Sequence, residues 1–104
     1  MIDSEVHVGD VGVAVVLTMT GQDDLPLDVS SATVKKIFVE DPAGVVVEHG
    51  ASFVTDGMDG KIRYATVVGD FGVEGDWRAQ GYVELASGSK LHSAVLEFYV
   101  RENL

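Results

Sequence analysis

Two long segments near the end of the chain, Gly75–Leu85 and Lys90–Arg101, alternate between apolar or small residues and polar residues. A period of two is typical of a half-buried β-strand. Between the segments, Ser87 and Gly88 suit a two-residue turn, because glycine takes a positive φ without steric cost. The sequence therefore predicts one long β-hairpin, which limits the fold class more than any other feature of the chain.

The two-residue turn sets the register of this hairpin, and a shift of one residue would turn every side chain to the opposite face. In the expected register most inward residues meet inward residues, and outward residues of opposite charge meet each other. The expected pairs are Trp77 with Phe98, Ala79 with Leu96, Gly81 with Ala94, and, as an outward ion pair, Arg78 with Glu97. Near the tip the same register places Leu85 opposite Lys90, and His92 inward opposite Val83.

Two features of the hairpin predict how its inner face packs. Trp77 is the only tryptophan, and we expect it to anchor the core. The small pair Gly81 and Ala94 leaves room for a bulky side chain from a facing sheet.

The rest of the chain also favours strands, since turn signals recur at about the 8–12-residue spacing of β-sandwiches. The first expected element is an edge strand within residues 1–8, with Val6 and Val8 inward. Further strands are expected over 13–19 (Val13, Val15, Leu17 and Met19 inward), 33–40 (Ile37 and Val39 inward), 45–54 and 61–67 (Ile62 and Tyr64 inward). Turns are expected at 41–44 and 56–60, and a corner over 69–76. A length of 104 residues suits a single domain, residues 1–104. We expect an all-β fold, an immunoglobulin-like antiparallel β-sandwich of about seven strands. A single-sheet barrel is the alternative.

One short motif occurs twice. The segments Val8–Val13 and Val68–Val73 are identical at five of six positions, but their flanking residues do not match. We interpret them as two similar turns with the same local need for glycine and aspartate, rather than as a duplicated fold.

Composition argues against several classes of function. The net charge is −10, from 17 acidic and 7 basic residues, which disfavours binding to a phosphate backbone. There is no cysteine, so disulfides and thiolate chemistry are excluded. No segment approaches the ~20 apolar residues of a membrane span, and the first residues do not resemble a signal peptide. We therefore expect a protein made in the cytoplasm that binds neither nucleic acid nor membrane.

Residues suited to catalysis or metal binding are present, but their spacing predicts no site. The aspartates and glutamates of three loops do not match the twelve-residue calcium loop, and Asp56 and Asp59 are better explained as turn residues. Each histidine lacks a second histidine at ligand spacing. The only Gly-flanked serines lie at the hairpin tip and do not form a nucleophile elbow. We expect a protein that is not an enzyme and has no catalytic, cofactor-binding or metal-binding residues.

The outward residues of the hairpin form the candidate interaction face. Tyr82, Val95 and Tyr99 have outward parity, as does Leu91 near the tip. An aromatic and aliphatic strip of this kind suits a subunit interface, although scattered surface apolar residues are common. The expected face consists of Arg78, Tyr82, Val95, Glu97 and Tyr99.

Several turns and strand ends together resemble a known family. They are Val8–Gly12, Leu27–Thr33, Asp41–Gly44, Phe53–Gly57, Asp59–Tyr64, Val68–Phe71, Gly75–Gln80 and Leu96–Val100. Across nearly its whole length the chain resembles the small immunoglobulin-like proteins encoded among the structural genes of tailed bacteriophages. It is similar in particular to the N-terminal domain of phage baseplate upper proteins.

The resemblance implies a virion component that acts by protein–protein assembly with other virion proteins, including copies of itself. No fibre or receptor-binding region follows Leu104 in this sequence, so the expected location extends from the baseplate to the tail, neck or capsid surface. The alternative is a carbohydrate-binding or host-adhesion module on the virion surface, with Tyr82 and Tyr99 as stacking platforms.

Overall fold

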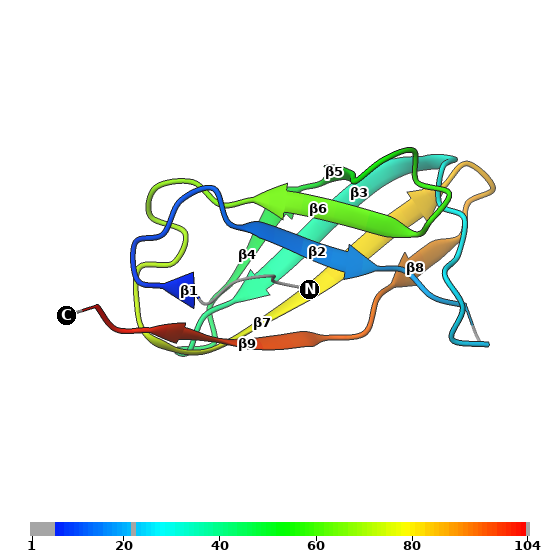
Figure 1. The fold of residues 1–104 in the computed structure, drawn as a ribbon. Coiled ribbons are helices and arrows are strands. Elements are labelled where there is room, and N and C mark those ends of the chain that lie inside the picture. The colour runs from blue at the N-terminus through cyan, green and yellow to red at the C-terminus, as the bar shows by residue number, and fades with distance from the viewer. Residues whose placement is uncertain (1–5, 22, 104) are drawn as a thin grey trace.

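The computed structural model describes residues 6–21 and 23–103, and in this part of the chain the protein is all-β with no helix. Two sheets pack face to face, and the short strands β2 and β6 lie across the long strands β3 and β7 (Figure 1). The larger sheet has the order β1 (Val6–His7), β9 (Leu96–Arg101), β7 (Gly75–Leu85), β3 (Ala32–Glu40) and β4 (Val46–Gly50), with β8 (Lys90–His92) also pairing with β7. The smaller sheet has the order β2 (Ala14–Thr18), β6 (Lys61–Ala65) and β5 (Ser52–Phe53).

This arrangement confirms the predicted sandwich, because the order β9-β7-β3-β4 facing β2-β6-β5 is that of an immunoglobulin-type fold. One strand pairing differs from the expected antiparallel arrangement. Strand β1 pairs with β9 in parallel, with Val6 beside Val100. Alternation of apolar residues indicates which face of a strand is buried, but it carries no information about strand direction.

The expected strand over residues 45–54 is divided between the two sheets. Strand β4 completes the edge of the larger sheet, and after Ala51 the chain continues as β5 in the smaller sheet. The change of sheet leaves β4 as an edge strand of the larger sheet.

The central hairpin has the predicted register over most of its length. Trp77 pairs with Phe98, Ala79 with Leu96, and Arg78 with Glu97. The side chain of Trp77 is buried, with 5% of its surface exposed, which confirms its expected place in the core.

The predicted register is wrong at the tip of the hairpin. The turn has three residues rather than two: Leu85 N donates to Ser89 O (2.9 Å), and Gly88 has a φ of 94°. The pairs next to the turn are therefore Glu84 with Lys90, Val83 with Leu91, and Tyr82 with His92. As a result, Leu91 packs against the core and His92 is exposed, the reverse of the predicted orientations.

A bulge between β8 and β9 restores the expected register. Ser93 is buried within it; its amide donates to Gly81 O (2.9 Å) and its hydroxyl accepts from Gly81 N (2.8 Å). Ala94 is exposed. The prediction that it faces Gly81 within the core is therefore wrong. As predicted, a bulky side chain of the smaller sheet fills the room that Gly81 leaves. A Cβ atom at Gly81 would lie only 3.0 Å from Ile62 Cδ1.

The two copies of the repeated motif form the same turn, which confirms their interpretation. Asp10 N donates to His7 O (3.1 Å), and Asp10 Oδ2 accepts from His7 N (2.9 Å). Asp70 makes the same two bonds with Val67, at 3.1 Å and 2.7 Å. The turns also contact each other, because Gly9 N donates to Phe71 O (2.8 Å).

The core lies between the sheets and contains nearly all of the residues predicted to point inward. Val8, Val13 and Tyr64 are partly buried and pack against it. Its buried hydrophobic residues are Val6, Val15, Leu17, Met19, Val29, Ile37, Val39, Ile62, Phe71, Trp77, Ala79, Val83 and Val100.

Candidate functional site

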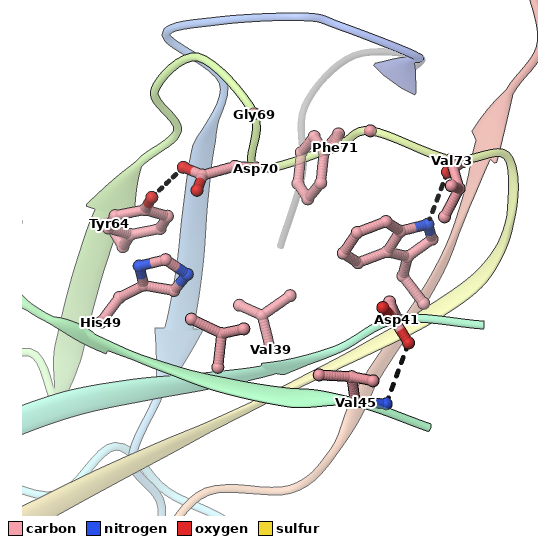
Figure 2. A pocket seen from close by; sticks show the side chains of 12 residues that line it. Val39, Asp41, Val45, His49, Tyr64, Gly69, Asp70, Phe71 and Val73 are labelled. Atoms are coloured by element: carbon pink, nitrogen blue, oxygen red, sulfur yellow. Dashed lines mark hydrogen bonds between the residues drawn. The ribbon is translucent and has the colours of Figure 1, made fainter. Parts of the chain in front are cut away.

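A pocket of about 210 Å³ opens between the sheets beside edge strand β4 (Figure 2). Its walls come from the end of β3, from β4, from β6 and from the corner that leads into β7. The volume is below the ~300–1,000 Å³ typical of small-molecule sites, so the pocket suits one or two side chains. The residues that line it are Val39, Asp41, Val45, Val47, His49, Tyr64, Gly69, Asp70, Phe71, Gly72, Val73 and Trp77.

Aromatic side chains form the floor of the pocket. The rings of Phe71 and Trp77 meet edge to face, with centroids 5.2 Å apart. Trp77 Nε1 donates to Val73 O at 3.1 Å, so the polar group of the indole is satisfied. The floor is therefore apolar, and its rings are held by packing and by this hydrogen bond.

A chain of polar side chains forms one wall. The Tyr64 hydroxyl donates to Asp70 Oδ2, and the His49 ring stacks on the Tyr64 ring with centroids 4.0 Å apart. Burial, assisted by the Asp70 carboxylate, raises the pKa of the Tyr64 hydroxyl above its usual range. Tyr64 therefore remains a neutral hydrogen-bond donor at physiological pH.

The carboxylates at the pocket hold the backbone of the chain in place. Asp41 Oδ1 accepts from the amides of Ala43 and Val45, both at 2.9 Å, and this closes the predicted β-turn before β4. Asp70 is bound by Tyr64 and by the Val67 amide. With these oxygens occupied, the exposed valines at the rim provide the surface that a ligand would contact.

The acidic turn residues have a similar structural role. Asp56 Oδ1 accepts from the Met58 amide and Asp59 Oδ1 from the Lys61 amide, each at 3.0 Å, as expected of turn residues. Over residues 6–21 and 23–103, no three His, Asp or Glu side chains are grouped so that they could hold a metal ion.

The predicted interaction face lies on the outer side of the larger sheet. Arg78 Nε donates to Glu40 Oε1 of β3 at 2.7 Å. Its guanidinium therefore pairs with Glu40, whereas the sequence predicted an ion pair with Glu97. Tyr82 is half-buried, and its hydroxyl donates to Glu84 Oε2 (2.8 Å). Val95 and Tyr99 are 48% and 50% exposed.

The two tyrosines of this face lie far apart. Tyr99 pairs with Asp76, which is six residues from Tyr82 along β7, or about 20 Å at the rise of a β-strand. The two rings therefore do not form one stacking platform.

Sequence reasoning missed the apolar groove on this outer face. It has a volume of about 400 Å³ and is lined by Phe38, Glu40, Val46, Arg78, Ala79, Gln80 and Val95. Of the predicted face, the groove includes Arg78 and Val95, and β4 contributes Val46.

A strand was expected here, and the signal that could have marked it as an exposed edge is the run Val45-Val46-Val47, which does not alternate with polar residues. All three valines are exposed, at 56%, 55% and 49%. Phe71 was missed for a different reason, because it lies between glycines in a segment expected to be only a corner.

Within the described residues, no helix is long and apolar enough to cross a membrane. Comparison of the sequence with protein-family models finds no match, and comparison with curated proteins finds none either.

Proposed function

We propose that this chain is a non-enzymatic structural component of a tailed-phage virion, which acts by binding other virion proteins. The resemblance of its turns and strand ends to phage immunoglobulin-like proteins supports the virion location. The assembly role is supported by one observation, the exposed valines Val45, Val46 and Val47 at the start of an edge strand.

An apolar edge strand is costly for a protein that works alone. Soluble proteins usually protect such edges with lysine, proline, bulges or very short strands, because a bare edge pairs with other chains. Strand β4 has none of these features, and its one charged side chain is Glu48. A partner that covers β4 in an assembled particle would remove this liability.

Purified particles test the proposal directly. Particles released from cells that carry the gene would be purified by density and washed in high salt, and their proteins quantified by mass spectrometry. We expect the chain to remain at a fixed copy number relative to the major capsid or tail protein. Its absence from washed particles, or turnover of a substrate by the purified chain, would contradict the proposal.

A further inference from the structure

Strand β4 has an outer edge whose backbone groups are available for pairing. In an antiparallel ladder, alternate residues point their N–H and C=O groups toward the partner strand. Asp41 N donates to Val45 O, and Ala51 N donates to Lys35 O, so the odd-numbered residues from 45 to 51 face β3. The backbone groups of Val46, Glu48 and Gly50 therefore face away from β3, where no strand of the described chain pairs with them.

The other sheet edges are less suited to receiving a strand. Within the described residues, strands β1 and β5 have two residues each and strand β8 has three. Strand β2 has five, but its side chains are buried or half-buried. Strand β4 combines length with exposure on both faces.

Each face of β4 borders a hollow. Val45 and Val47 line the pocket between the sheets, and Val46 lines the groove on the outer face. Successive side chains of a strand point to opposite faces. A strand added beside β4 would therefore direct alternate side chains toward these two apolar hollows, as in known cases of strand addition.

Charge indicates the chemistry of the incoming segment. At the turn before β4, a further groove is lined by the carboxylates of Glu40, Asp41, Asp76 and Glu97 and by only one cation, Arg78. The whole chain has a net charge of −10. A second copy would bring a second charge of −10 to the interface, whereas a segment with lysine or arginine beside this turn would be attracted.

We infer that β4 receives an extended segment of a different protein, which pairs with its outer edge, directs apolar side chains toward the two hollows, and places a basic residue near the turn at residues 41–44. The inference rests on the proposed function, in that the chain acts by binding other proteins. It adds the site, the mode of binding and the chemistry of the partner.

A designed peptide tests this inference with the purified chain. The probe is a seven-residue peptide of alternating valine and threonine with a lysine added at each end, and the matched probe carries glutamate at both ends. Titration would be followed by amide NMR. We expect shifts at β4, and weaker binding of the glutamate peptide by about tenfold.

Glu48→Pro is the decisive variant, because it removes an amide that faces outward and leaves the ladder with β3 complete. It also removes the ion pair with Lys36, so Glu48→Gln, which keeps the amide, is the matched control. We expect Glu48→Pro to weaken binding at least about tenfold, the equivalent of one good hydrogen bond, and Glu48→Gln to bind like the wild type. Val47→Lys, at an exposed position on the rim of the pocket, should also weaken binding of the peptide. It replaces Glu48→Pro as the test variant if the proline variant does not fold.

With the purified chain, three results would overturn the inference: no binding of the lysine peptide, equal binding by Glu48→Pro and Glu48→Gln, or self-association of the chain that Glu48→Pro abolishes. The last result would identify a second copy as the occupant of β4. Incorporation of Glu48→Pro into particles at the wild-type copy number would also overturn it, while leaving the proposed virion role intact.

Discussion

Strands β2 and β4 are both five residues long and both lie at the edge of a sheet, yet they have opposite environments. In β2, alternate side chains are fully buried, and each of its residues pairs with β6. In β4, each residue pairs with β3, but four of the five are exposed. A complete backbone ladder therefore does not bury a strand, because burial requires a facing layer, which β2 has and most of β4 lacks.

The largest expected effect tests this difference in burial. Leu17→Ala in β2 should lower the free energy of unfolding by about 2–5 kcal/mol, because it leaves a cavity in the core. Val47→Ala in β4 should change it by no more than about 0.5 kcal/mol, as is usual for exposed positions. Urea denaturation of both variants measures the two values. Similar losses in the two strands would mean that β4 is covered in the isolated chain.

The next effect concerns the turns that adjoin the two strands. Gly60, whose carbonyl accepts from Met19 N just after β2, has a φ of 75°, and a Cβ atom there would lie 2.6 Å from Met19 O. Gly44, just before β4, has a φ of 88° with nothing within 4 Å of a Cβ atom. Gly44→Ala should therefore cost about 1–2 kcal/mol from backbone strain alone.

Gly60→Ala should cost more than this, because the same strain is added to a clash with the backbone. The melting temperatures of the two alanine variants rank the costs. If Gly60→Ala lowers the melting temperature no more than Gly44→Ala does, the loop beside β2 relaxes as easily as the turn beside β4.

Tyr64 joins the two strands, since it pairs with Val15 of β2 and stacks on His49 of β4. The folded state raises the pKa of Tyr64 above the value of about 10 for an unfolded tyrosine. The stabilisation from its neutral form is therefore complete below about pH 10 and is lost as the pH rises above that value.

Tyr64→Phe should remove this pH dependence. At neutral pH it should cost about 0.5–1.5 kcal/mol for the lost hydrogen bond to Asp70. In alkaline solution the wild type should lose stability more steeply than the variant, as measured by denaturation at a series of pH values. Parallel curves would indicate that the hydroxyl is not bound to Asp70.

The smallest expected effect is at the surface of β4. Lys36 Nζ lies 3.1 Å from Glu48 Oε1, and both side chains are substantially exposed. Glu48→Gln should therefore cost no more than about 1 kcal/mol, and the difference should vanish in high salt. A larger, salt-independent loss would indicate that β4 is more buried than its exposure suggests.

Local patterns were sufficient to predict most of the sandwich. Trp77, Ile37, Val39, Val15 and Leu17 were assigned to the core from alternation alone, and the structure confirms all five. The central register was also predicted correctly, because the hydrophobic pattern permits only one alignment of the two strands there.

The alternation of apolar and polar residues did not predict the hairpin tip correctly. Near the turn, few apolar residues remain to distinguish a two-residue from a three-residue connection. The compensating bulge depends on the Ser93 hydroxyl and the Gly81 amide, which are distant in the sequence. The pairing of β1 with β9 was also unpredictable, since direction leaves no trace in the alternation.

The candidate site was predicted only in part. Val95 and Arg78 were expected on the outer face and do line its groove. The pocket between the sheets was not anticipated, because Asp70, Phe71 and Tyr64 meet His49 only through the packing of both sheets.

The sequence by itself determined most of the buried residues, the approximate places of the turns and which strands form the central hairpin, because these depend on side-chain polarity and local backbone preferences. Only the tertiary structure decided that β4 would lie at an open edge between two hollows. That outcome depends on how far the smaller sheet extends over the larger one, which is set by the packing of side chains from distant segments.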